Sequence, residues 1–166
     1  MTEQEQTDQT FMKLALEQGQ LAYDAGEVPV GAVVVLDGQV IGRGYNKPIT
    51  SLDPSAHAEV VALRDAALNI GNYRLSKAVL YVTVEPCTMC SGLLVHSRIA
   101  RLVYGTTEPK SGVIESAMCL LDQPFYNHKI EISGGVLAKE ASTLMSEFFS
   151  MRRAGKKKLK KATQTL

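Results

Sequence analysis

Two short motifs constrain this chain more than any other feature of its sequence. His57-Ala58-Glu59 opens an apolar run of helical spacing, and Pro86-Cys87-Thr88-Met89-Cys90 directly follows a β-branched run. Because Cys87 and Cys90 are three residues apart, a helix that begins there carries both thiols on one face. Two thiolates so close repel each other unless a cation lies between them, and the positive end of the helix dipole favours their ionised form. The pair therefore predicts a metal site at a helix start.

His57 would complete a His-Cys-Cys ligand set for this metal. Soft thiolate ligands indicate zinc, and three protein ligands leave the fourth tetrahedral corner for water, as in a catalytic site. Two thiolates and a neutral imidazole bring the divalent ion to net zero, and the bound water then loses a proton far more easily than bulk water. Glu59 would carry protons beside that water without being a ligand.

Each motif alone has other interpretations. A structural zinc site needs a fourth protein ligand. The other Cys and His residues are His96, Cys119 and His128, and none of them has ligand-like spacing. Cys119 lies in an apolar stretch, which predicts a core position. A redox C-x-x-C pair leaves His57 and Glu59 unexplained. The combination of H-x-E with P-C-x-x-C is typical of zinc-dependent deaminases.

Hydrophobic periodicity predicts an alternation of strands and helices along the rest of the chain. Strands that alternate with helices imply an α/β layer with one mixed sheet. The Asp37-Gly38 pair between two apolar runs predicts a hairpin, and Gly71 should follow the end of a helix. The expected helices are 9–25, 55–69, 86–96 and 137–153, and the expected strands are 28–36, 39–45, 78–84, 101–105 and 129–133.

Charge is distributed unevenly along the 166 residues. Seven of the 18 basic residues lie after Ser150, a segment without Asp or Glu, although the net charge is only +1. A basic extension on an acidic body favours a polyanionic partner such as RNA, and a solvated, frayed tail is the alternative. No apolar run is long enough to span a bilayer, and the polar N-terminus does not resemble a secretory signal, so we expect a cytoplasmic protein.

The sequence resembles the bacterial tRNA-specific adenosine deaminases, within the cytidine deaminase superfamily. The resemblance runs from about Phe11 to Arg153 and rests on these segments: Glu27–Val35, Gly44–Asn46, Asp53–Glu59, Asn72–Leu75, Leu80–Cys90, His96–Ile99 and Phe148–Arg153. It implies a three-layer α/β/α sandwich around a five-stranded mixed sheet. Residues 1–153 would form the deaminase domain, and residues 154–166 a basic C-terminal tail.

The resemblance also implies the reaction and the partners. The enzyme would convert adenosine to inosine at the wobble position (34) of a tRNA. That tRNA would be an arginine tRNA. A zinc-bound water would attack C6, Glu59 would shuttle protons, and ammonia would leave. His57, Cys87 and Cys90 would hold one Zn²⁺ per subunit of a homodimer. Both subunits would contribute to the surface that binds the tRNA anticodon stem-loop.

Further residues match the family's substrate contacts. Asn46 would contact the target nucleoside, and Pro29, Val30 and Pro86 would form the pocket wall. Asn127 would contact the RNA backbone or sugar near the target. Flanking nucleotides would be met by Lys110, Phe149, Arg152 and Arg153. Each of these residues also has a structural interpretation. Asn46 is favoured in turns, and arginines are favoured at a helix C-terminus. Phe148 and Phe149 could both lie in the core, and at most one of them should contact RNA.

The chain departs from the family pattern at Glu108, where an Asp is usual. Glutamate is one methylene longer, so its contact with the flanking ribose would shift. Two rival functions remain. A deaminase of a free base or nucleoside, such as guanine or cytosine, would use the same metal site with a smaller, closed pocket. A non-catalytic zinc-binding RNA module would have no use for Glu59.

Overall fold

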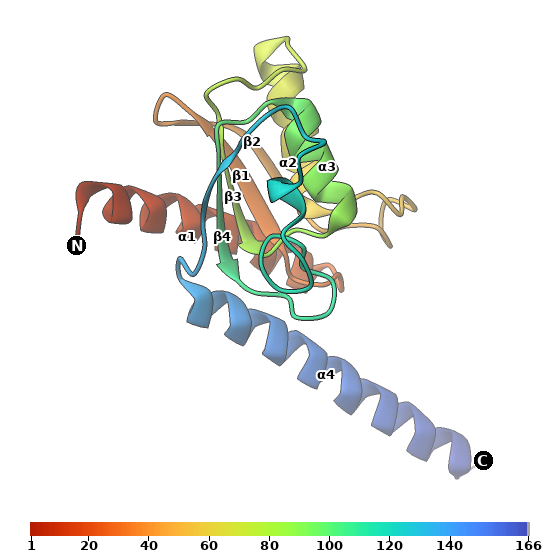
Figure 1. The fold of residues 1–166 in the computed structure, drawn as a ribbon. Coiled ribbons are helices and arrows are strands. Elements are labelled where there is room, and N and C mark those ends of the chain that lie inside the picture. Colours follow the sequence, from red (N-terminus) through yellow and green to blue (C-terminus); the bar gives the residue numbers. More distant parts are fainter. Residues whose placement is uncertain (166) are drawn as a thin grey trace.

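A computed structural model describes residues 1–165, so Leu166, the last residue of the predicted tail, lies outside the described residues. Strands and helices alternate as expected (Figure 1). The elements in order are α1 (Glu3–Asp24), β1 (Gly31–Leu36), β2 (Gln39–Tyr45), α2 (Ala58–Ile70), β3 (Val79–Val84), α3 (Thr88–Ser97), β4 (Arg101–Thr106), the 3-10 helix η1 (Leu120–Asp122), β5 (Glu131–Ser133) and α4 (Ala138–Gln164).

The five strands form one mixed sheet in the order β2-β1-β3-β4-β5. β1 runs antiparallel to both β2 and β3, whereas β3, β4 and β5 are parallel. Asp37 and Gly38 join β1 to β2 with φ angles of 50° and 76°, the left-handed conformation that a tight two-residue hairpin turn requires. The predicted hairpin and the predicted mixed sheet are both confirmed.

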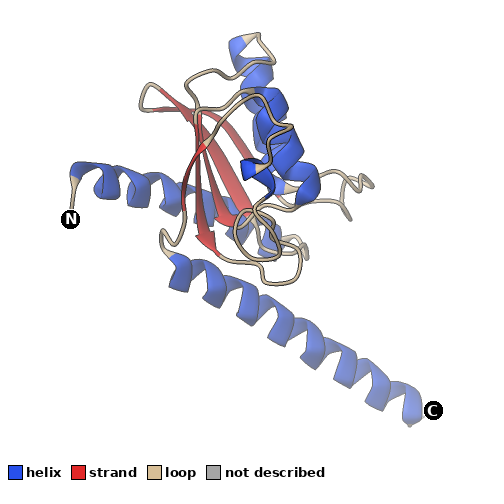
Figure 2. Ribbon diagram, viewed as in Figure 1, coloured by secondary structure: helices blue, strands red, loops and turns tan. Residues whose placement is uncertain are grey.

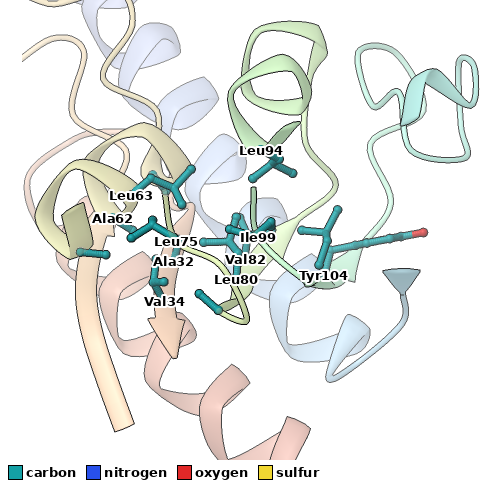
Figure 3. Packing of buried hydrophobic residues seen from close by; sticks show 14 of the residues in the cluster. Ala32, Val34, Ala62, Leu63, Leu75, Leu80, Val82, Leu94, Ile99 and Tyr104 are labelled. Carbon is teal, nitrogen blue, oxygen red and sulfur yellow. The ribbon is translucent and has the colours of Figure 1, made fainter. Parts of the chain in front are cut away.

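Alternate strand residues pack against different helices and so divide the core into two layers. Val34, Leu80 and Val82 point into the cluster that also holds residues of α2 and α3 (Figure 3). Val33 and Tyr81 point the other way, into a cluster with α1. Figure 2 shows the sheet between α1 and the α2–α3 pair. The three-layer α/β/α architecture is therefore confirmed.

Helix α1 begins six residues earlier than the apolar pattern predicts. A capping box closes its first turn, because Glu5 N–H donates to the Thr2 hydroxyl and Thr2 N–H donates to the Glu5 carboxylate. Asp8 is buried in this extra segment, where it accepts two hydrogen bonds from Arg101 of β4, at 2.8 and 2.7 Å, and one from the Tyr81 hydroxyl at 2.9 Å. Polar contacts, and not an apolar stripe, hold this end of the helix.

Helix α4 is longer than expected and continues through the basic segment to Gln164, where the sequence predicted an end at Arg153. Only Ala141 and Phe148 of α4 are buried, and its second half projects away from the sheet (Figure 1). No proline follows Arg153, and the one glycine there, Gly155, lowers helix stability by only about 1 kcal/mol relative to alanine. The helix therefore continues past Arg153.

Cys119 was expected in the core but is exposed, at the start of η1. The surrounding 107–130 segment is mostly loop, so the apolar residues near Cys119 do not define one buried face. Among the described residues, no helix combines the length and apolar character needed to cross a bilayer.

Candidate active site

His57 and Cys87 each occupy the N-cap position of a helix. His57 precedes α2 and Cys87 precedes α3, both with extended backbone, and neither side chain caps its own helix. Their side chains are therefore free to point to a common centre at the positive ends of two helices. Gly71 ends α2 in the left-handed conformation, as predicted. Both helices start a little later than expected, at Ala58 and Thr88, which leaves two of the ligand candidates just before the first helical residue.

The three predicted metal ligands come together in the structure. The Nδ1 atom of His57 lies 3.6 Å from the Sγ atom of Cys87 and 3.6 Å from that of Cys90. All three donor atoms lie within 4.8 Å of one another. A tetrahedral zinc ion, with bonds of about 2.3 Å to sulfur and 2.0 Å to nitrogen, separates such atoms by about 3.6 Å. The donor set thus fits a zinc ion in both chemistry and spacing.

The two thiols do not ionise together on their own. A hydrogen bond from Cys90, with help from His57, lowers the pKa of Cys87 to about 3 against the effect of burial. The same hydrogen bond, together with burial, raises the pKa of Cys90. Cys87 therefore ionises while Cys90 keeps its proton, and a cation between the two sulfur atoms would allow both to ionise.

Glu59 lies in the first turn of α2, where its side chain is only 4% exposed. Burial raises the pKa of this carboxyl group, although a hydrogen bond with Cys90 acts in the opposite direction. A carboxyl group with a raised pKa binds a proton more readily than an exposed glutamate does, which suits a group that must take up a proton and then pass it on. The residue expected to carry protons thus has the required environment beside the donor cluster.

A cavity of about 340 Å³ opens beside this cluster. It brings together several of the residues predicted from the sequence: Val30, Asn46, His57, Glu59, Cys87 and Glu108. The Asn46 amide donates a 3.2 Å hydrogen bond to the Val28 carbonyl, which fixes the orientation of the amide at the cavity wall. The remaining lining residues were not predicted: Val28, Pro48, Val84, Glu85, Ser111 and Met145. Most lie on loops or on α4, where no local motif marks them.

Two of the predicted wall residues lie behind the surface of the cavity. Pro29 and Pro86 are buried and are not among the lining residues. The Pro86 carbonyl accepts a 3.0 Å hydrogen bond from Val113 N–H, so Pro86 supports the loop that follows β4.

The predicted RNA contacts of α4 lie at a second cavity of about 310 Å³. Phe149 and Arg153 line it, and it shares Val84, Glu108 and Met145 with the first cavity. Arg152 instead lies with its guanidinium 5.2 Å from the centre of the Phe148 ring. Lys110 is exposed, and its N–H donates a 3.0 Å hydrogen bond to Glu108 Oε1. Of the two phenylalanines, Phe148 is buried and Phe149 is 38% exposed, so only Phe149 has a surface that could contact RNA.

The structure does not bring Asn127 to either cavity. Its side chain accepts a 3.1 Å hydrogen bond from Arg98, which follows the last residue of α3. Cys87 precedes the first residue of the same helix, so Asn127 is bonded to a residue at the opposite end of α3 from Cys87.

The comparisons with known proteins agree with this fold and site. Residues 5–106 match the family model of the cytidine and deoxycytidylate deaminase zinc-binding region, which places the chain in the class of zinc-binding deaminases. A tRNA-specific adenosine deaminase from Haemophilus influenzae is 50% identical over 151 residues, which cover 90% of this chain and 87% of that protein.

Solved structures show the same relationship. One from a study of A-to-I editing by tRNA:A34 deaminases at the wobble position superposes with a TM-score of 0.79 and 42% identity, over 81% of this chain and 98% of that one. A guanine deaminase from Nitrosomonas europaea, 24% identical, shares the fold with a TM-score of 0.72 over 84% of this chain and 83% of that one. The chain therefore belongs to the family of bacterial tRNA-specific adenosine deaminases and is a hydrolytic deaminase.

Proposed function

We propose that this protein converts adenosine to inosine at the wobble position, position 34, of a tRNA, and that an arginine tRNA is its substrate. The observation that carries the proposal is that the cavity lined by His57, Cys87 and Glu59 borders a second cavity, lined by Phe149 and Arg153 of α4, with which it shares Met145. Family membership supports the same substrate, because the Haemophilus influenzae relative is a tRNA-specific adenosine deaminase and the 42% identical structure comes from a study of tRNA:A34 deaminases.

One Zn²⁺ per chain would be held by His57, Cys87 and Cys90, whose donor atoms have the spacing described above. A bound zinc ion lowers the pKa of a water molecule and so provides a nucleophile near neutral pH. Glu59 would take up a proton from that water as it attacks C6 of the purine. The same carboxyl group would pass protons to purine N1 and to the leaving ammonia, and its burial keeps it in a position to exchange them.

The cavity suits one base taken out of its stack. A deaminase cannot reach its target atom inside a stacked helix, and an anticodon loop already presents splayed bases. The volume of about 340 Å³ falls at the lower end of the usual range for ligand sites. Asn46 would bind the nucleoside, and Val30 would form part of the wall, supported from behind by Pro29 and Pro86.

Helix α4 would bind the nucleotides that flank the target. Phe149 and Arg153 line the second cavity together with Met145. Arg152, over the Phe148 ring, and Lys110, in the loop after β4, would reach the RNA from beside it. Residues 154–166 would form a basic tail after the deaminase domain of residues 1–153. Asn127 would contact RNA at a point away from the cavity.

A homodimer is the proposed state. Its support is an apolar groove of about 360 Å³ between α2 and α3, bordered by the exposed side chains of Tyr73 and Met89. Met89 lies between the two candidate thiol ligands in sequence, so a second chain on this groove would lie next to the active site. A protein that modifies tRNA would work in the cytoplasm.

The two rival functions make different predictions. The fold alone does not separate tRNA from free bases, since a guanine deaminase shares it. The basic face of α4 next to the cavity favours RNA, because a free base offers no phosphates to bind. A buried carboxyl group beside the donor cluster argues against a module that only binds zinc.

The test is conversion of adenosine 34 in an unmodified arginine tRNA by the zinc-loaded protein, read by sequencing for inosine. Glu59→Gln should retain one zinc per chain by metal analysis and lose about 10²- to 10⁴-fold in rate, the usual contribution of a general acid–base group. Glu17→Gln, an exposed substitution on α1, is the matched control. Ammonia release from free nucleosides with none from tRNA would overturn the substrate. Full activity of Glu59→Gln would overturn the mechanism.

A further inference from the structure

Two loops that are distant in sequence wall the same cavity. The loop after β2 contributes Asn46 and Pro48, and the loop after β4 contributes Glu108 and Ser111. Asn46 directly follows β2, but Pro48 lies in a segment without helix or strand, and so do Glu108 and Ser111. Side-chain contacts therefore contribute to holding the two walls in place.

A buried carboxylate anchors the first loop. Glu27 lies between α1 and β1 and is 1% exposed. Its Oε1 accepts a 3.2 Å hydrogen bond from Ile49 N–H, and its Oε2 accepts a 2.7 Å hydrogen bond from Thr50 N–H. Both donors lie just after Pro48, so the carboxylate fixes the backbone directly beside the residue that lines the cavity.

A second buried carboxylate anchors the other loop. Glu85 lies at the end of β3, two residues before Cys87, and is 4% exposed. Its Oε2 accepts the N–H groups at 114, 115 and 116 at 2.9 to 3.0 Å. Its Oε1 accepts Glu108 N–H at 3.0 Å and the Ser116 hydroxyl. One side chain thus binds both ends of the segment that carries Ser111.

The loop sequence is adapted to this anchor at Gly112. A Cβ atom at this position would overlap the carboxyl carbon of Glu85, so only glycine allows the loop backbone to approach so closely. All hydrogen-bond donors to the two carboxylates are neutral backbone or hydroxyl groups, and every bond is assisted by the charge of the acceptor. The two buried negative charges are therefore balanced mainly by N–H and O–H groups of the loops that they order, and Arg152 adds a longer-range attraction to Glu27.

We propose that Glu27 and Glu85 are positioning residues for deamination. They hold the two cavity-wall loops at the separation that the extruded nucleoside requires, although neither need contact the base that reacts. The consequence for deamination rests on the proposed function, whereas the anchoring of the loops does not.

The anchors are tested directly by amide hydrogen exchange of the zinc-loaded full chain. Glutamine places an NH₂ group against N–H donors, so Glu27→Gln should accelerate exchange at Ile49 and Thr50. Glu85→Gln should accelerate exchange at 108 and 114–116. We expect at least about tenfold in each case, as expected for loss of a hydrogen bond to a charged group. Glu17→Gln, exposed on α1, should change neither set, and unchanged exchange in both anchor variants would overturn the proposal.

Steady-state kinetics with tRNA separates positioning from simple loss of folded protein. A displaced wall should raise KM about tenfold with kcat within about threefold, whereas a smaller folded fraction lowers kcat and leaves KM unchanged. Faster exchange with an unchanged KM would overturn the positioning role. If wild-type protein shows no activity on tRNA, the proposed function fails while the exchange result still decides the anchors. If Glu85→Gln does not fold, Glu27→Gln and Ser116→Ala test the two loops separately.

Discussion

Two adjacent phenylalanines of α4 should separate the stability of the protein from its binding of RNA. Phe148 is fully buried, packs edge-on against Tyr23 with ring centroids 5.5 Å apart, and lies under the guanidinium of Arg152. Phe149 is 38% exposed and lines the second cavity beside Arg153. Each substitution is therefore the matched control of the other.

Phe148→Ala should lower the free energy of unfolding by about 4 kcal/mol, the middle of the range for a buried phenylalanine and inclusive of the aromatic contact. For a chain of this size that corresponds to a fall of roughly 8–16 °C in Tm. Because Phe148 is one of only two buried residues of α4, part of the loss should appear as faster amide exchange along 141–151.

Phe149→Ala should cost clearly less stability than Phe148→Ala, because 38% of the Phe149 side chain is exposed, although the edge-on contact with the Phe148 ring is also lost. Loss of one stacked base would raise KM for tRNA by roughly 5- to 150-fold, from about 1–3 kcal/mol of stacking. Urea unfolding and initial rates with tRNA measure the two effects. Equal losses of stability in the two variants, or a larger KM effect from Phe148→Ala than from Phe149→Ala, would refute this assignment of roles.

The remaining predictions concern charged groups. Asp8→Asn should destabilise the protein by about 3 kcal/mol at neutral pH, because it removes the buried carboxylate partner of Arg101 and leaves only the exposed Glu131 at 3.7 Å. Burial raises the pKa of Asp8, but hydrogen bonds from Arg101 and Tyr81 outweigh it and hold that pKa below the ordinary 3.8. The stabilisation from this ion pair is thus present above about pH 4 and is lost as pH falls through the lower pKa of the folded state. The free energies of unfolding of wild type and Asp8→Asn should therefore converge in acid. A difference that stays constant with pH would contradict this. Lys156→Ala with Lys160→Ala should weaken tRNA binding and reduce the slope of log affinity against log salt by about 2, whereas an unchanged slope would show that these lysines do not meet phosphates.

The donor cluster could be predicted from sequence because its geometry is mostly local. A spacing of three residues at a helix start places Cys87 and Cys90 together, whatever the rest of the fold. His57 opens a second helix, and only its family pattern linked the two motifs before the structure placed Nδ1 3.6 Å from both sulfur atoms. The hairpin at Asp37-Gly38 was equally local, since its backbone conformation depends on those two residues.

Contacts between distant segments decided the rest. Helix α1 extends to include Asp8 because Asp8 pairs with Arg101, which lies 93 residues away in sequence. Cys119 is exposed because its segment packs over Glu85 and Pro86 without forming a regular element. Neither relation leaves a periodic trace in the sequence. A buried carboxylate such as Glu27 is stable only where the folded backbone supplies its hydrogen-bond donors, and those donors come from a distant loop. The sequence by itself therefore determined the reactive groups. The tertiary structure alone decided which loops enclose them.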